Sequence, residues 1–324
     1  MVRSHSMKSD ILLNCFLFPG QGAQYPGMGR DLWESSSVVK KLFADASEWT
    51  GMDIPELLFE SSEEELKKTE NTQVGITAVN LAVLLLLKEA GIRPDAAAGF
   101  SLGEFSALAA AEVLNLEEVF PLVKKRGAIM AAAAEKLSAG ENGPGMAAVM
   151  GLSPDRVQEL CANSDLELYA ANFNSPDQTV VGGTHTALVQ GKEYFTGNGA
   201  KRWIPLKVSA PFHTPLMRDA RSEFAEVVRT LNFKDPAIRL ISNVSGKLVT
   251  SGEDARELCL AQVISPVRWT AEEETILALK TEICIEAGPG KVLSGLWKKI
   301  NSDVPCLNAG TLDEINTIRN TYSS

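Results

Sequence analysis

The chain has 324 residues, of which 45% are hydrophobic and 22% charged, and its formal net charge is −10. This length allows one large domain, or a main domain with a second one inserted. The negative charge argues against a surface that binds nucleic acid, although it leaves room for a local basic patch that meets an acidic protein.

The first half of the chain alternates between strand and helix patterns. We predict strands over 11–18 and 95–100, and helices over 27–48, 63–90, 103–112 and 116–137. Asn115 and Glu118 form a capping box for the last helix, whereas Pro121 should kink it. Strands that alternate with helices are typical of a mostly parallel sheet covered by helices.

Two apolar segments could be mistaken for membrane or secretion signals. Asp10 stands directly before the run at 11–18 and no small-residue cleavage site follows it, so we interpret this run as a buried strand. The run at 76–87 is too short to cross a bilayer and is expected to be a buried helix. The five cysteines have no paired spacing, so we expect reduced thiols in a cytoplasmic protein, with no membrane partner.

The pattern changes after the glycine-containing segment 138–145. Strand 146–151, helix 153–163, strands 166–172 and 178–182, helix 184–198 and strand 200–208 give a βαββαβ order, which is typical of a ferredoxin-like domain. Helices over 215–231, 252–262 and 290–300 and strands over 238–244 and 281–286 follow. We therefore predict an α/β main domain of residues 8–137 and 209–310, a small domain of residues 138–208, and a site in the cleft between them.

Ser101 is the first candidate for chemistry. It is the central residue of a G-x-S-x-G motif, at the predicted turn from strand 95–100 into helix 103–112. Such a turn exposes the serine hydroxyl and places free N–H groups of the helix beside it, as a nucleophile requires. The alternative is a serine that only caps the helix.

A nucleophilic serine needs a base, and the chain has three histidines. His5 lies in the N-terminal tail, and His185 stands at a predicted helix start. His213 lies between Pro211 and Pro215, where the small domain returns to the main one, and elimination makes it the best candidate. More than a hundred residues follow His213, unlike the histidine of an α/β-hydrolase triad, which follows the last strand.

Several motifs together resemble the malonyl-CoA:acyl-carrier-protein transacylases, from about Leu13 to about Leu307. They are FPGQGAQ at 18–24, GFSLGE at 99–104, KRGAIM at 125–130, NFNSP at 172–176, FHTPLM at 212–217, QVISPVRW at 262–269 and EAGPGKVL at 286–293. The resemblance implies an α/β-hydrolase-like main domain and an acyl-carrier-protein S-malonyltransferase. Its substrates would be malonyl-CoA and the phosphopantetheine thiol of acyl carrier protein, in a ping-pong reaction that supplies fatty-acid synthesis.

The resemblance also implies the roles of single residues. Ser101 would attack the thioester and His213 would act as base, while the main-chain N–H groups of Gln21 and Leu102 would hold the oxyanion. A main-chain carbonyl near Gln262 would orient the imidazole, with the glutamine side chain close to the site. These assignments need no metal and no redox cofactor.

Substrate choice would depend on further positions. Arg126 would bind the malonyl carboxylate through two parallel hydrogen bonds, whereas the alternative is a solvated basic face shared with Lys124 and Lys125. Asn172 would line the cleft. Phe212 would restrict room for an α-methyl branch. Phe100 departs from the histidine that is common in the family.

Other functions remain as alternatives at this point. A stand-alone malonyl acyltransferase of a polyketide synthase would share every catalytic residue. A serine hydrolase would release free malonate to water, and a silent module would bind the carrier protein without transfer. No feature fixes the oligomeric state, and we expect a monomer.

Overall fold

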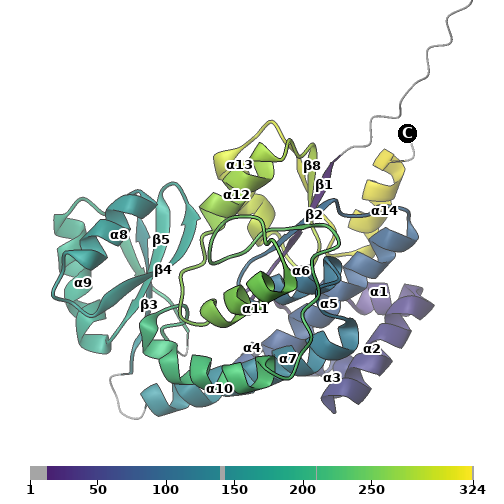
Figure 1. The fold of residues 1–324 in the computed structure, drawn as a ribbon, viewed down its shortest axis with the longest axis horizontal. Coiled ribbons are helices and arrows are strands. Elements are labelled where there is room, and N and C mark those ends of the chain that lie inside the picture. Colours follow the sequence, from purple (N-terminus) through teal and green to yellow (C-terminus); the bar gives the residue numbers. More distant parts are fainter. Residues whose placement is uncertain (1–12, 139–142, 209, 323–324) are drawn as a thin grey trace, which may run out of the picture.

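The computed structural model describes residues 13–138, 143–208 and 210–322, which form a mixed α/β structure with two separate sheets (Figure 1). Several predictions lie outside these residues: the start of the main domain at residue 8, the first two residues of strand 11–18, His5, and the boundary at 209.

The larger sheet has five strands in the order β7-β2-β1-β8-β9, and all its neighbouring strands are parallel. Their bounds are β1 (Asn14–Phe18), β2 (Ala96–Gly99), β7 (Arg239–Leu240), β8 (Ile283–Glu286) and β9 (Cys306–Asn308). β1 and β2 are buried along their whole length, as strands covered on both faces should be. The loops after β1 and β2 leave the sheet at the same edge, because the strands run in the same direction.

Helices cover both faces of this sheet. Phe16 and Phe18 point into one core with α5 (Thr69–Glu89), α6 (Gly103–Ala110) and α7 (Leu116–Leu137). Cys15 and Leu17 point the other way, into a core with α12 (Trp269–Ala278) and α13 (Val292–Ile300). The alternation of strand side chains thus divides the apolar residues between two layers.

Apart from the two helices that follow strands of the smaller sheet, the remaining described helices belong to the first layer. They are α1 (Arg30–Ser35), α2 (Ser37–Thr50), α3 (Ile54–Phe59), α4 (Glu63–Lys67), α10 (Arg218–Val228), α11 (Gly252–Ala261) and α14 (Leu312–Tyr322), with a 3₁₀ turn at Pro215–Met217. Ile315 and Ile318 of α14 are buried in the same core as α5. This core therefore includes residues that follow position 310.

The second sheet has four strands in the order β4-β5-β3-β6, all antiparallel, and lies on the left of Figure 1. Its elements are β3 (Gly145–Met150), α8 (Pro154–Ala162), β4 (Leu168–Ser175), β5 (Gln178–Gly183), α9 (His185–Gly197) and β6 (Arg202–Pro205). The predicted βαββαβ order is observed. β6 is shorter than the predicted strand 200–208.

Some helix boundaries differ from the prediction. The segment 27–48 is two helices, because Ser36 adopts an extended conformation and caps α2 by accepting from the N–H groups of Val38 and Val39. The segment 63–90 is divided at Lys68, whose backbone is also extended. The capping box of Asn115 and Glu118 is present, and α7 continues through Pro121.

Helix α5 is long and apolar enough to cross a membrane by length and composition, but 89% of its most apolar window is buried within the described structure. A helix that is apolar on all sides and covered by protein is a core helix. Asn80 on α5 donates to the Pro19 carbonyl at 3.0 Å, so α5 also supports the loop that follows β1.

Three cysteines that are distant in sequence stand side by side in the larger sheet. Cys15 is in register with Cys284, and Cys284 with Cys306, on β1, β8 and β9. All three are free thiols. Burial raises the pKa of Cys284 and Cys306, which keeps both thiols protonated and poorly nucleophilic.

The turn after β2 is packed so tightly that we predict Gly103→Ala to destabilise the protein. A Cβ atom at Gly103 would lie 1.9 Å from the Phe18 carbonyl oxygen. We expect a loss of about 1–3 kcal/mol, measured as a lower melting temperature. Gly295→Ala, in α13, is the control because a Cβ there meets no atom within 4 Å, and equal melting temperatures for the two variants would contradict the packing argument.

Candidate active site

Ser101 lies on a sharp turn between β2 and α6. Its φ is 52°, a left-handed conformation that is uncommon for residues other than glycine. The main chains at Gly99 and Gly103, on either side of Ser101, are in close contact, because a Cβ at Gly99 would lie 2.2 Å from the Gly103 main chain. The structure therefore has the strand-turn-helix geometry that the sequence motif predicts.

His213 is the histidine that the structure brings to Ser101. The Ser101 Oγ lies 2.7 Å from His213 Nε2, and His213 Nδ1 lies 2.9 Å from the Gln262 main-chain oxygen. A carbonyl can only accept, so Nδ1 carries the proton and Nε2 is free to accept from the serine. His185 begins α9 and lines a different hollow.

Burial, together with the smaller effect of the positive charge of Arg126, lowers the pKa of His213 to about 4. The imidazole is therefore neutral at physiological pH. A neutral imidazole that accepts from a serine hydroxyl is the state that a general base requires.

Gln262 connects the groups of the site. Its main-chain oxygen bonds to His213, and its side-chain oxygen accepts from Arg126 at 2.8 Å. Its amide nitrogen donates to the Ser101 carbonyl at 2.9 Å and to the Glu104 carboxylate. The side chain is 1% exposed, so water does not compete for these bonds.

Arg126 is buried in α7 and not on a solvated face, whereas its neighbour Lys125 is exposed. It donates to Gln73 Oε1 at 2.9 Å and to Gln262, and its Nε–H has no partner in the described structure. It forms no ion pair with any described residue. Burial lowers the pKa of Arg126 to about 10, so it remains a cation at neutral pH.

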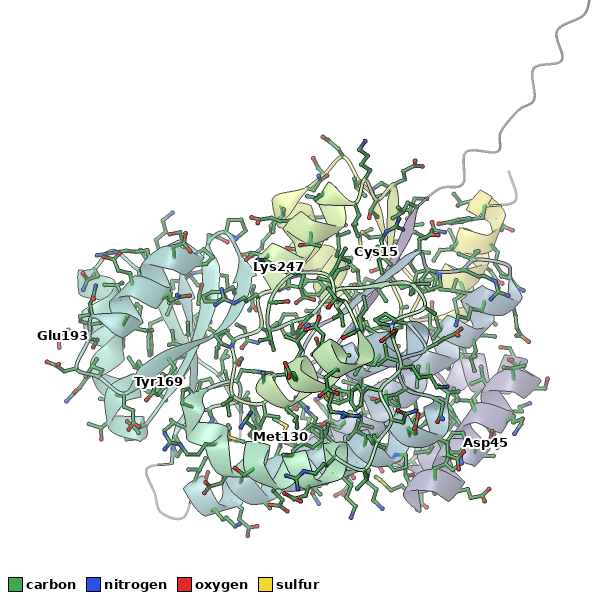
Figure 2. The ribbon with its side chains drawn as sticks, viewed as in Figure 1. Cys15, Asp45, Met130, Tyr169, Glu193 and Lys247 are labelled. Carbon is green, nitrogen blue, oxygen red and sulfur yellow. The ribbon has the colours of Figure 1, made fainter. Side chains whose placement is uncertain are left out.

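The dyad opens into a cavity of about 210 Å³. Arg126 forms part of its wall, and so does Met130 from the same helix, which is labelled in Figure 2. Gln21 and Leu102 also line it, and neither of their main-chain N–H groups has a protein acceptor in the described structure. The loop of Gln21 rests on the turn of Ser101, because a Cβ at Gly20 would lie 2.2 Å from the Phe100 oxygen.

The smaller sheet supplies the opposite wall. Asn172 on β4 is 8% exposed and lines the cavity, as does Asn174, whose buried side-chain oxygen has no partner in the described structure. Phe212 also lines it. Phe100 packs on Trp269 with ring centroids 5.5 Å apart, so this ring contributes to the core behind the turn.

Four polar residues of the site were not predicted from the sequence. They are Gln73, Glu104, Asn174 and Asn243. Glu104 stands in the predicted helix after Ser101 at 5% exposure, and burial raises its pKa to about 7. The one signal that could have indicated Glu104 is a charged residue on an otherwise apolar helix, whereas nothing in the sequence indicates Gln73 or Asn243.

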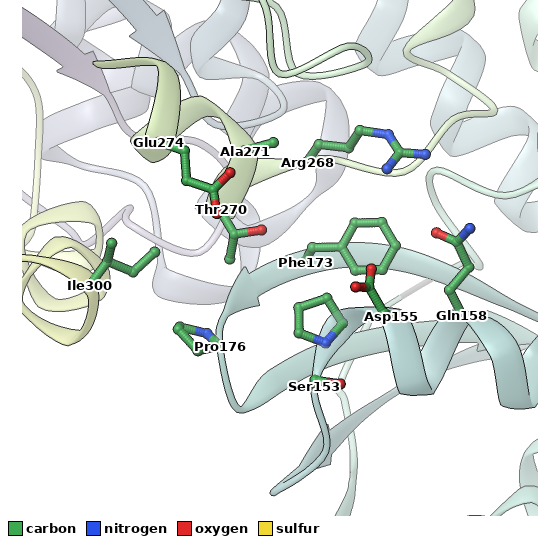
Figure 3. Close-up of a pocket in the computed structure, with 11 residues that line it drawn as sticks. Ser153, Asp155, Gln158, Phe173, Pro176, Arg268, Thr270, Ala271, Glu274 and Ile300 are labelled. Atoms are coloured by element: carbon green, nitrogen blue, oxygen red, sulfur yellow. The ribbon is translucent and has the colours of Figure 1, made fainter. Parts of the chain in front are cut away.

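A second hollow, of about 430 Å³, lies between the start of α8 and the start of α12 (Figure 3). Its residues have mixed charge, with Arg268 placed 5.5 Å from the ring of Phe173 and with Asp155 and Glu274 nearby. Neither a histidine nor a cysteine lines it. The candidate nucleophile and base line the cavity at Ser101 and not this second hollow, so we place the chemistry in the Ser101 cavity.

Comparisons with known proteins agree with this geometry. Residues 15–303 match the model of the acyl transferase domain family, and the chain belongs to that family. The malonyl CoA-acyl carrier protein transacylase of Bacillus subtilis is 41% identical over 289 residues, which are 88% of this chain and 90% of that protein.

Two solved structures are similar over almost the whole chain. An acyl carrier protein S-malonyltransferase from Vibrio cholerae has a TM-score of 0.89 and 36% identity, over 94% of this chain and 99% of that one. A malonyl-transacylase in complex with its type II PKS acyl-carrier protein has a TM-score of 0.89 and 34% identity, over 95% of this chain and 99% of that one.

The lowered pKa of His213 predicts an unusual pH profile. For a malonyl thioester that lacks the nucleotide, kcat/KM should fall only below pH about 5, because the free enzyme keeps His213 neutral above its pKa of about 4. Glu104→Gln serves as the control, since it removes the other nearby ionisation. In that variant, a fall in kcat/KM with its midpoint near 6.5, the ordinary pKa of histidine, would contradict the interpretation of His213 as a buried, neutral base.

Proposed function

We propose that the protein transfers a malonyl group from malonyl-CoA to the phosphopantetheine thiol of acyl carrier protein. The observation that carries the proposal is a buried Arg126 cation, without a carboxylate partner among the described residues, on the wall of the cavity that holds Ser101 and His213. A buried cation without a carboxylate is costly, and an anionic substrate offsets that cost. The names of the relatives at 41% and 36% identity support the same substrate.

In the first half-reaction, Ser101 Oγ attacks the thioester carbonyl and His213 Nε2 takes the hydroxyl proton. The N–H groups of Gln21 and Leu102 stabilise the oxyanion. The C–S bond breaks, and the imidazolium returns its proton to the CoA thiolate. The product is malonyl-Ser101.

In the second half-reaction, the carrier thiol gives its proton to His213 and attacks the acyl-enzyme. The bond to Ser101 Oγ breaks and the serine recovers the proton. The reaction is ping-pong because CoA leaves before the carrier thiol attacks. No step requires a metal ion or redox cofactor, since the acyl group changes partner without oxidation.

The malonyl carboxylate would bind the guanidinium of Arg126, with Asn172 beside it in the cavity. Phe212 would restrict room next to the α-carbon, which favours malonyl over methylmalonyl. We place the reaction in fatty-acid synthesis in the cytoplasm, with the polyketide version as the alternative, and we expect a monomer.

We also infer the domain assignment. The larger parallel sheet with its serine turn supports an α/β-hydrolase-like domain. The βαββαβ order and the strand order β4-β5-β3-β6 support a ferredoxin-like small domain, with both domains contributing to the cavity.

The fate of the acyl-enzyme separates a transferase from a hydrolase. We expect isolated malonyl-enzyme to discharge to the phosphopantetheinylated carrier protein much faster than to water, followed by mass spectrometry of both proteins. The carrier without its phosphopantetheine arm is the control. Hydrolysis as fast as transfer would identify a hydrolase, and a stable acyl-enzyme that ignores the carrier would contradict the proposed acceptor.

Arg126→Ala should lower the rate constant of malonyl loading about 100-fold, because removing one partner of a buried charge pair costs about 3 kcal/mol. Acetyl loading from acetyl-CoA should change much less, since acetyl has no carboxylate. Lys125→Ala is the matched control, because Lys125 is the exposed neighbour on the same helix. Equal losses for both acyl groups would mean that Arg126 has a structural role only.

A further inference from the structure

The backbone of Ser101 is held from behind by a residue outside the catalytic dyad. Its N–H donates to Asn243 Oδ1 at 2.6 Å, across 142 positions of sequence. A left-handed conformation is strained for a residue other than glycine, and it persists only where the surroundings fix it. The bond to Asn243 is one such restraint, and it acts on the nucleophile's own peptide.

Asn243 is itself fixed by the sheet. β7 pairs with β2, so the chain after β7 runs beside the turn of Ser101, and the Ile241 N–H donates to the Ala97 carbonyl at 3.0 Å. The Asn243 main-chain N–H donates to Glu104 Oε1 at 2.9 Å. The side chain is fully buried, so its position does not depend on solvent.

The orientation of the Asn243 amide is determined by its neighbours. Its nitrogen donates to the Gly99 carbonyl and lies 3.1 Å and 3.2 Å from the two carboxylate oxygens of Glu272. The Gly99 carbonyl can only accept, and Glu272 offers the nitrogen an accepting oxygen whether or not it holds a proton, so the amide oxygen must face Ser101. Glu272, fully buried on α12, thus fixes the orientation of the group that accepts from the nucleophile's N–H.

The main-chain N–H groups of Ser101 and Leu102, which are adjacent in sequence, have different surroundings. The Ser101 N–H points inward to Asn243, whereas the Leu102 N–H has no protein acceptor in the described structure and belongs to a residue that lines the cavity. Without Asn243, the Ser101 peptide could rotate. Rotation would move Oγ away from His213 Nε2 and turn the Leu102 N–H away from the cavity.

We propose that Asn243 is the positioning residue of the nucleophile and that Glu272 holds it in the required orientation. This rests on the proposed function, because it takes Ser101 as the group that is acylated. Asn243 touches neither the substrate nor the reacting atoms. Its effect should therefore appear in the rate of acylation at saturating substrate and not in substrate binding.

The test is the pre-steady-state loading of the full chain by malonyl-CoA. We expect Asn243→Ala to lower the limiting acylation rate constant about 100-fold, the scale of effect expected when a reacting group is displaced by about 1 Å. The half-saturating malonyl-CoA concentration and the preference for malonyl over acetyl should stay within about threefold, because Arg126 is unchanged. Circular dichroism checks that the variant is folded.

Two substitutions of Glu272 provide the second test. Glu272→Gln keeps an oxygen that can accept from the Asn243 amide nitrogen, whereas Glu272→Leu removes it. Glu272→Gln should load at least about tenfold faster than Glu272→Leu, because the leucine leaves a buried amide donor without this acceptor. The same two substitutions at Glu273 are the control, because Glu273 is also fully buried on α12 and makes no hydrogen bond to Asn243.

The outcomes are distinct. Loading of Asn243→Ala within about threefold of the parent would overturn the proposal, as would a Glu272→Gln variant that loads no faster than Glu272→Leu. If Asn243→Ala does not fold, the comparison of the two Glu272 variants decides. A parent protein that is never acylated at Ser101 would instead overturn the proposed function.

Discussion

The site depends on one constraint: a buried glutamine that must bond to four groups at once. Gln262 orients His213 through its main-chain oxygen, while its side chain joins Arg126, Glu104 and the Ser101 carbonyl. It occupies the C-cap position of α11, so a helix of the larger unit sets its place. A single residue thus contacts Ser101, His213 and Arg126, and a shift of any one of these three would break its bond to Gln262.

The same network also connects the positive charge of Arg126 to the basicity of His213. Arg126 lowers the pKa of His213, and this effect weakens when a substrate carboxylate pairs with the guanidinium. On the proposed function, the imidazole would therefore be a stronger base with a malonyl group in the cavity than with an uncharged acyl group. Selection of the substrate and activation of the serine would then depend on the same cation, Arg126.

Local sequence patterns predicted the elements that carry the nucleophile. The strand and helix around Ser101, the capping box of α7 and the βαββαβ order follow from periodicity and turn residues. Helix α12 was not predicted, because its buried face carries Glu272 and Glu273 beside Trp269 and Ile276, which breaks the apolar repeat. Glu272 is buried beside Asn243, near the turn of Ser101, and a single sequence gives no sign of that.

Long-range polar contacts account for the other omissions. Asn243 meets Ser101 only because β7 pairs with β2, and Gln73 meets Arg126 only because α5 packs on α7. Elimination among three histidines found His213 without knowledge of the fold. No comparable scarcity applies to asparagine, glutamine or glutamate, so their roles required the structure.

The central claim is that Ser101 becomes covalently malonylated. The intact mass of the protein after brief mixing with malonyl-CoA tests it most directly, with Ser101→Ala alongside. The account predicts an increase of one malonyl group on the parent and none on Ser101→Ala. An unchanged parent mass, or the same increase on Ser101→Ala, would contradict it.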